Sequence, residues 1–207
     1  MRVSFLCAVV AVALTIQSGE LLAKEQGDWI LRAGVGQVDP KSPNGSLDGT
    51  DINIYADTAT TFIFDATYMV SQNWGIELLA SAPFDHDIDL EGLGKVGSTK
   101  QLPPTLSGQY HFNPIGRVQP YVGLGFNVTL FFSEDTRGAL SGSSLKLSNS
   151  FGLAAQAGVD IEVSENVYLN AVIRYMDIET DAKVDGSKVA TVKIDPMVYG
   201  LNLGYRF

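Results

Sequence analysis

The sequence predicts an all-β protein, an eight-stranded antiparallel transmembrane β-barrel with short periplasmic turns and long extracellular loops. Three observations favour this fold: eight segments alternate apolar and polar residues, the connections between them alternate in length, and the chain ends on an aromatic residue, Phe207. A period of two residues places the apolar side chains on one face of a strand. In a transmembrane barrel that face meets lipid and the opposite face meets the lumen.

Residues 1–23 have the pattern of a secretory signal peptide. An apolar run from Leu6 to Ile16 is followed by a small-residue region that ends at Ala23. A membrane-anchoring helix is the alternative, but the run is shorter than the roughly 20 apolar residues that a span requires. We therefore expect residues 24–207 to form one outer-membrane barrel domain.

The composition excludes several classes of function. A net charge of −9 gives no electrostatic footprint for nucleic acid. The single cysteine, Cys7, lies in the leader, so disulfides, thiolate metal sites and cysteine nucleophiles are excluded from the mature chain. The chain carries no phosphate loop, zinc spacing or nucleotide fingerprint, and we predict no metal and no cofactor.

The eight strands are predicted in order from their alternating apolar residues. These are Trp29, Leu31, Ala33, Val35; Phe62, Phe64, Ala66, Tyr68, Val70; Trp74, Ile76, Leu78, Ala80; Leu102, Leu106, Tyr110, Phe112; Val118, Val122, Leu124, Phe126, Val128, Leu130, Phe132; Phe151, Leu153, Ala155, Ala157, Val159, Ile161, Val163; Val167, Leu169, Ala171, Ile173, Tyr175; and Met197, Tyr199, Leu201, Leu203, Tyr205, Phe207. A soluble barrel with its apolar face inward alternates in the same way. The leader, the terminal Phe and the connections favour the membrane.

The connections alternate between short and long. Residues 71–73, 113–117 and 164–166 form short turns, whereas residues 39–59, 85–98, 133–149 and 177–190 form long polar loops rich in Gly, Ser and Asp. This is the pattern of outer-membrane barrels. Aromatic residues gather near the strand ends and predict two girdles: Trp29, Tyr68, Trp74, Tyr110, Phe112, Tyr168, Tyr205 and Phe207 on the short-turn side, and Phe84, Phe131, Phe132 and Tyr175 on the loop side. The alternative is that aromatic residues simply favour strands.

Short segments along the whole mature chain resemble the outer-membrane protein W (OmpW) family, which includes proteins linked to uptake of alkanes and other small hydrophobic molecules. The matching segments include GIELLA at 75–80, PFDH at 83–86, KQLPPTL at 100–106, QPYVG at 119–123, YMDI at 175–178, IDP at 194–196 and GYRF at 204–207. The resemblance implies a monomeric barrel in the outer membrane of a Gram-negative bacterium. It also implies a narrow, partly apolar lumen, open outside and blocked toward the periplasm, that passes small hydrophobic solutes sideways into the bilayer.

Prolines mark a predicted lateral gate between the third and fourth strands. Pro83 lies high on the third strand, and Pro103 and Pro104 lie at a matching height on the fourth. Proline cannot donate a ladder hydrogen bond, so a seam that contains three of them is weakened and can part locally. The alternative is that the prolines merely end pairing where the strands leave the membrane.

The inward faces predict two zones in the lumen. Opposite charges near the short-turn end predict a periplasmic ionic plug of Arg32, Asp65, Glu77, Asp160, Glu162 and Arg206. Apolar residues above predict a lumen for a hydrophobic solute, lined by Ile63, Leu79, Phe131, Val172 and Met176. A filled structural core is the alternative for this upper zone.

The sequence does not predict an enzyme. His111 and Ser107 share an inward face but lie roughly 13 Å apart, too far for a hydrogen bond. His86 lies in an acidic run with Asp85, Asp87, Asp89 and Glu91, which is either a divalent-cation or lipopolysaccharide contact or, as we expect, a solvated loop. Arg137 and Lys146 are alternative contacts for lipopolysaccharide.

We therefore expect a passive outer-membrane channel for small hydrophobic molecules, with lateral release at the prolines of the third and fourth strands. Its expected partners are outer-membrane lipid and lipopolysaccharide, the solutes, and the barrel-assembly machinery, which would read Tyr205 and Phe207 at the end of the last strand. The alternatives are a structural barrel whose loops bind phage, colicins or host cells without transport, and a narrow ion channel.

Overall fold

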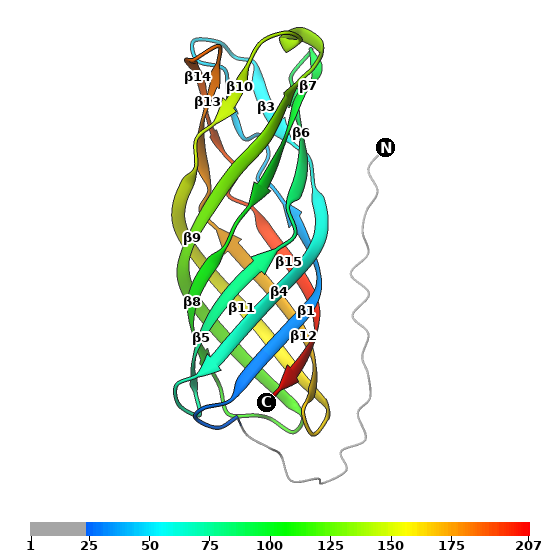
Figure 1. Cartoon of the computed structure of the whole chain (residues 1–207), viewed down its shortest axis with the longest axis vertical. Helices are drawn as coiled ribbons and strands as arrows, with labels where there is room; N and C mark the ends of the chain where they lie inside the picture. The colour runs from blue at the N-terminus through cyan, green and yellow to red at the C-terminus, as the bar shows by residue number, and fades with distance from the viewer. Residues whose placement is uncertain (1–23) are drawn as a thin grey trace.

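The computed structural model describes residues 24–207, which form an elongated closed barrel (Figure 1). The predicted signal peptide, residues 1–23, lies outside the described residues. Eight antiparallel strands make the wall, in the order β1 (Trp29–Asp39), β4 (Ala59–Met69), β5 (Trp74–Ser81), β8 (Thr105–His111), β9 (Val118–Thr136), β11 (Ser150–Ser164), β12 (Val167–Met176) and β15 (Met197–Arg206). The last strand pairs with the first, from Ile30 opposite Arg206 to Asp39 opposite Met197, and this pairing closes the sheet.

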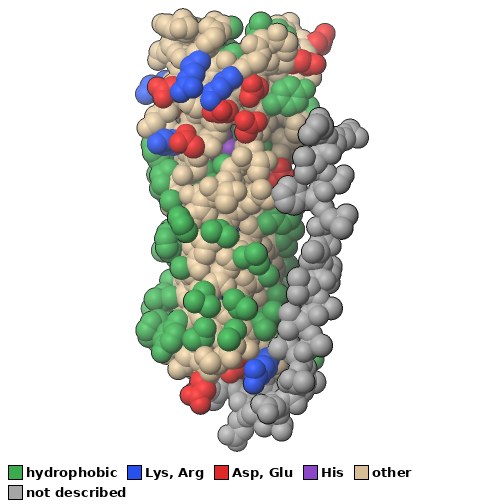
Figure 2. Space-filling model, turned by 90° about the vertical axis from the view of Figure 1, so that its right-hand side faces the viewer, with side chains coloured by type: hydrophobic (Ala, Val, Ile, Leu, Met, Phe, Trp, Pro, Cys, Tyr) green, Lys and Arg blue, Asp and Glu red, His purple; other side chains and the backbone are tan. Residues whose placement is uncertain are grey.

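The apolar face of each strand points outward, as predicted for a wall in hydrocarbon. Leu201, Leu203 and Phe126 expose 66%, 58% and 54% of their surface, whereas their neighbours Gly200, Asn202 and Asn127 are buried. Figure 2 shows hydrophobic side chains along the lower and middle parts of the barrel, most of the charged ones at its upper end and a few at its lower rim. So much exposed apolar surface is not tolerated by a monomer in water, and this excludes the inverted, soluble arrangement for this fold.

The short turns lie together at the lower end of the barrel in Figure 1, beside the end of the chain. They connect β4 to β5, β8 to β9 and β11 to β12, as predicted. Trp29, Tyr68, Trp74, Tyr205 and Phe207 are exposed at this end and form the expected aromatic girdle. Tyr168, Phe84 and Phe131 were expected in the girdles, but they are buried and face inward, because each occupies the lumen-facing parity of its strand.

The long extracellular connections are present as predicted, and they contain short strands that the sequence did not predict. The upper end contains β2 (Gly45–Ser46), β3 (Asn53–Ala56), β6 (Phe84–Leu90), β7 (Gly94–Leu102), β10 (Leu145–Leu147), β13 (Glu179–Val184) and β14 (Ser187–Lys193). They continue the barrel upward, with β7 paired to the upper part of β9. Backbone pairing needs no apolar side chains, and here both faces of the strands are partly polar, so the period-two signal is weak.

Helical structure is almost absent from residues 24–207. The helix found there is the short 3₁₀ turn Gly138–Leu140. No helix in this range is long and apolar enough to cross a membrane.

Candidate functional site

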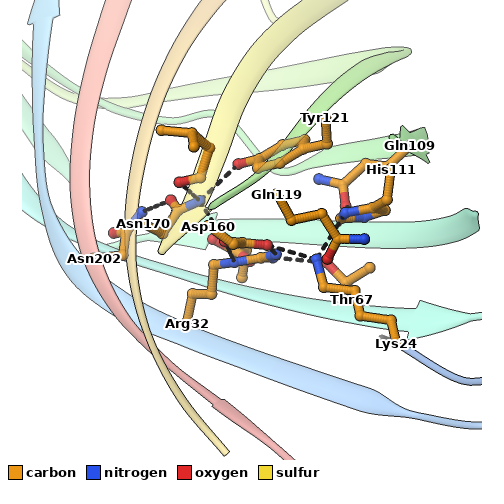
Figure 3. A network of polar contacts seen from close by, with 12 residues as sticks. Lys24, Arg32, Thr67, Gln109, His111, Gln119, Tyr121, Asp160, Asn170 and Asn202 are labelled. Carbon is orange, nitrogen blue, oxygen red and sulfur yellow. Dashed lines mark hydrogen bonds and ion pairs between the residues drawn. The ribbon is translucent and has the colours of Figure 1, made fainter. Parts of the chain in front are cut away.

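The floor of the lumen is a buried network of charged and amide side chains centred on Arg32 (Figure 3). Arg32 donates to both carboxylate oxygens of Asp160, from Nη2 at 2.7 Å and Nε at 3.1 Å, and to Asp65 Oδ1 at 2.9 Å. Such a two-pronged guanidinium–carboxylate pair is strong and directional. The ring of Tyr121 lies 5.4 Å from the Arg32 guanidinium, at cation–π distance.

A second part of the floor is built around Glu77. Gln156 donates to Glu77 Oε1 at 2.9 Å, and Arg174 Nη2 lies 3.4 Å from Glu77 Oε2 and 3.6 Å from Asp65 Oδ2. Gln109 also donates to the Glu77 carboxylate. The floor therefore sets three cations, Lys24, Arg32 and Arg174, against three carboxylates, Asp65, Glu77 and Asp160.

All eight wall strands contribute to this floor. Its members come from β1, β4, β5, β8, β9, β11, β12 and β15 in the order Arg32, Asp65, Glu77, Gln109, Tyr121, Asp160, Asn170 and Asn202. Gly158 makes room for it, because a Cβ at that position would lie 2.4 Å from the Tyr121 ring. The cross-links span the cross-section of an eight-stranded barrel, whose lumen is only about wide enough for side chains.

Four of the six residues predicted for the ionic plug meet in this floor: Arg32, Asp65, Glu77 and Asp160. Glu162 and Arg206 lie apart from it, at the rim. Glu162 is half-buried beside a register shift at the end of β11 and forms no ion pair with any residue of 24–207. Arg206 lies 3.8 Å from Asp28 and donates to the carbonyl of Glu165 at 3.2 Å.

Two floor cations were not predicted. Lys24 Nζ lies 2.6 Å from Asp160 Oδ2 and 2.8 Å from His111 Nδ1, but it precedes the first strand, so alternation gave no signal for its direction. Arg174 stands higher on β12, opposite Val198 and Gln156, and its long side chain reaches Glu77. Its inward parity was visible in the sequence, but its reach along the barrel axis was not.

A packed apolar layer lies above the floor. Ile63, Leu79 and Met176 border a void of about 10 Å³, the size of a single water molecule. Val172 is buried too, but it borders neither this void nor the chamber described below. Val172 and Ile63 converge over Gly200, where a Cβ would lie 2.8 Å and 3.0 Å from their side chains. At this height the lumen is a filled core, not the open tunnel expected from the sequence.

A chamber opens above this layer, inside the upper extension of the barrel. Its volume is about 420 Å³, within the range of small-molecule sites. The lining is mostly apolar and includes Ile54, Leu90, Val96, Phe131, Leu145 and Val192. Of the predicted lumen residues, only Phe131 lines the chamber. His86 and Gln101 lie among its polar lining residues. His86 was expected in a solvated loop, but it is buried on β6, and Gln101 was not predicted as part of a site.

The wall between β5–β6 and β7–β8 is interrupted at the predicted prolines. The β5–β8 ladder ends with Leu79 opposite Thr105, and the β6–β7 ladder begins with Phe84 opposite Gln101. Residues 80–83 and 102–104 lie between these pairs and are not paired with each other. Pro83 is exposed, Pro104 is half-buried, and Pro103 is buried and borders the small void. We call residues 80–83 and 102–104 the seam.

Each side of the seam remains attached to its outer neighbour. Ala82 donates to the carbonyl of Phe62 at 2.9 Å, and Val128 donates to the carbonyl of Pro104 at 3.0 Å. On the lumen side, the Asn127 amide donates to the carbonyls of Pro103 and Pro104 at 3.1 Å and 3.3 Å. Asn127 therefore stabilises carbonyls that the interrupted ladder leaves available. It was not predicted, although its position on the polar face of β9 was evident.

The seam lies where the apolar wall meets the charged upper end. Phe62, Leu106 and Leu130, on strands that border the seam, are exposed on the outside. Just above the seam Asp85 is opposite Lys100 in the β6–β7 register, with their charged atoms 3.6 Å apart. Asp87 also pairs with Lys95. Within residues 24–207, no group of three or more His, Cys, Asp or Glu side chains is placed to hold a metal ion.

The end of the chain lies on the outer surface at the lower rim. The rings of Tyr205 and Phe207 are 4.7 Å apart, and the amide of Phe207 donates to the carbonyl of Trp29 at 2.8 Å. Both side chains are exposed to the surroundings of the barrel. Their role as an assembly signal stays a prediction.

Comparison with known proteins gives concordant results. The sequence model described as the OmpW family matches residues 25–207. The chain is 36% identical to outer membrane protein W of Vibrio cholerae, over 96% of this chain and 97% of that protein. It is 32% identical to outer membrane protein AlkL of Ectopseudomonas oleovorans, over 88% and 83% of the two chains.

A solved structure shows the same architecture. The crystal structure of the outer membrane protein OprG from Pseudomonas aeruginosa superposes with a TM-score of 0.79 and 40% sequence identity, covering 88% of this chain and 97% of that one. The apolar outer face described above is therefore the face of an outer-membrane barrel. The short-turn end corresponds to the periplasmic side, and the upper end to the extracellular side.

Proposed function

The chain belongs to the OmpW family of outer-membrane β-barrels, and from that premise we propose that it admits small hydrophobic molecules passively and releases them sideways into the membrane. The solute enters the extracellular chamber and leaves through the seam. The observation that carries this proposal is the position of the seam, which interrupts the wall beside the lumen at the upper edge of the lipid-facing surface.

The floor favours lateral release into the membrane because it obstructs passage along the barrel axis to the periplasm. A solute moving toward the periplasm would have to displace the cross-linked ions around Arg32 and Glu77. Removing one partner of a buried ion pair leaves the other charge unpaired, at a cost of about 3–5 kcal/mol. The seam offers less resistance, since its two edges share no ladder hydrogen bonds between Leu79–Thr105 and Phe84–Gln101.

The packed layer sets a condition on this route. The void beside Pro103 holds about 10 Å³, so a solute passes only when Met176, Leu79 or Phe84 moves. Met176 is suited to such movement because an unbranched thioether side chain adopts many shapes. The driving force is the concentration gradient of the solute.

The test is delivery of an apolar dye, N-phenyl-1-naphthylamine, which fluoresces when it enters lipid. Pro103→Ala and Pro104→Ala restore two backbone donors to the seam, so we expect severalfold slower dye entry into intact cells that carry the doubly substituted barrel. Pro120→Ala, on β9 away from the seam, is the matched control and should leave entry unchanged.

The outcome separates the two functions that the sequence left open. Equal dye entry for the original barrel, the seam variant and cells without the protein would contradict transport and favour a barrel that acts through its extracellular surface. Heat-modifiable migration on gels checks that every variant is folded and inserted.

A further inference from the structure

The base of the extracellular chamber holds a buried pair of polar side chains, His86 on β6 and Gln101 on β7. They expose 4% and 1% of their surface. Gln101 borders both the chamber and the small void beside the seam, so it lies between the two spaces. A solute that follows the proposed route must pass this pair.

The hydrogen bonds of the pair fix which atoms are available to a ligand. His86 Nδ1 lies 2.7 Å from the carbonyl oxygen of Asp57, which can only accept, so Nδ1 carries the proton. In the neutral ring Nε2 then accepts, and it does so from the Gln101 amide nitrogen at 2.8 Å. The oxygen of the same amide, Oε1, is buried and has no hydrogen-bond partner among residues 24–207.

Burial lowers the pKa of His86 and keeps its ring neutral at neutral pH. The neighbouring acidic side chains Asp85 and Asp87 are paired with Lys100 and Lys95. The charged residues that line the chamber, Asp48 and Lys188, are exposed, and Lys188 pairs with Asp181 at 2.6 Å. The base of the chamber therefore contains a buried, uncharged acceptor, Gln101 Oε1.

We propose that Gln101, oriented by His86, is a specificity-determining residue that selects aliphatic molecules with one uncharged hydrogen-bond donor, such as a hydroxyl group. This inference rests on the proposed function and names its substrate class. The hydroxyl donates to Gln101 Oε1 and the aliphatic chain occupies the apolar chamber. A hydrocarbon or an ether of the same size leaves that buried acceptor unpaired, and a charged head group would lose its hydration without gaining a counter-ion.

Two isomers test the selection without any mutation. 1-Hexanol and 1-methoxypentane have the same formula, but only the alcohol can donate. Each is titrated into the mature barrel in lipid nanodiscs while NMR follows the methyl groups of Leu90 and Val192, which line the chamber, and the side-chain amide of Gln101. We expect about tenfold tighter binding of the alcohol, and a shift of the Gln101 amide with the alcohol alone.

Gln101→Met combined with His86→Leu removes Oε1 and also the His86 Nε2 acceptor that loss of the Gln101 amide would leave free, so the two isomers should then bind equally. Leu145→Met, elsewhere in the chamber, is the control that should keep the preference. Equal binding of the isomers to the unsubstituted barrel would overturn this inference and leave the proposed function standing. If neither isomer shifts the chamber methyl groups, the proposed function itself fails.

Discussion

Arg32 is buried at the centre of the barrel and is held by two carboxylates. Asp160 accepts from two of its nitrogens and Asp65 from a third. A buried guanidinium is tolerated only when its charge and its donors are matched, and here the matching carboxylates come from two other strands, β4 and β11. The residue thus joins β1, β4 and β11 through the lumen and contributes to closing it.

Replacing Arg32 should therefore destabilise the barrel. Arg32→Met keeps the length of the side chain but removes the nearest cation of Asp65 and one of the two cations of Asp160, which should reduce the free energy of unfolding by about 3–5 kcal/mol. Urea-induced unfolding in lipid vesicles measures this change. Glu162→Gln, at the rim, is the control and should stay within about 0.5 kcal/mol of the original. An Arg32→Met barrel as stable as the original would contradict the floor described here.

The sequence predicts which side chains face the lumen, but not how far they reach or how tightly they pack. Parity along a strand gives the direction of a side chain, so Arg32, Asp65, Glu77 and Asp160 were expected to face inward, and they do. Parity does not give reach or packing. It could not show that the lumen is filled beside Met176, or that Gln101 lies between two cavities.

At the scale of elements, strands that meet lipid were predictable and those above the membrane were not. β9 as far as Phe132 and the whole of β15 have an apolar outer face because hydrocarbon touches it. β13 and β14 meet water on one side and a partly polar interior on the other, so their alternation is weak. One local signal was available: Asp185 and Gly186, both with positive φ, form the kind of two-residue turn that favours a hairpin.

His86 connects the extracellular elements in a way that depends on pH. Burial lowers the pKa of its ring below the ordinary 6.5, although the carbonyl and charge of Asp57 and the charges of Asp85 and Asp87 oppose that shift. When this region opens locally and exposes His86 to water, the ring binds a proton more readily than it does in the folded barrel. The stabilisation is present above pH 6.5 and is lost as the pH falls below that value toward the lowered pKa.

Acidification from neutral pH should accordingly loosen the contact between β6 and the segment at Asp57. The amide of Asp57 donates to the carbonyl of Asp87 at 3.3 Å and reports this contact. After correction for intrinsic exchange, its hydrogen-exchange protection should fall between pH 7 and pH 5. His86→Gln should remove this dependence. If acidification lowers the protection of the Asp57 amide equally in the His86→Gln barrel, a group other than His86 causes the pH dependence.

At the scale of the whole molecule, the barrel has a closed periplasmic half and a hollow extracellular half. In the closed half, ion pairs link different strands of the wall across the lumen. The hollow half is formed where the sheet extends beyond the apolar band (Figures 1 and 2). The seam lies at the junction of the two halves. In our account a solute that enters the hollow half therefore finds its exit in the wall.

Cross-linking the seam tests that account most directly. The only cysteine of the chain is Cys7, in the predicted leader, so Ser81→Cys with Pro103→Cys, at two positions that border the same small void, creates one reversible bridge across the unpaired stretch. A second pair, Ile76→Cys with Gly108→Cys, bridges the same two wall strands where their ladder is intact. Mass spectrometry establishes that each bridge has formed.

Entry of N-phenyl-1-naphthylamine into the outer membrane of intact cells is then measured before and after reduction. We predict that the oxidised seam slows dye entry to the level of cells without the barrel, that reduction restores it, and that the control pair changes nothing. Dye entry at the same rate through the bridged and the reduced seam would contradict lateral release.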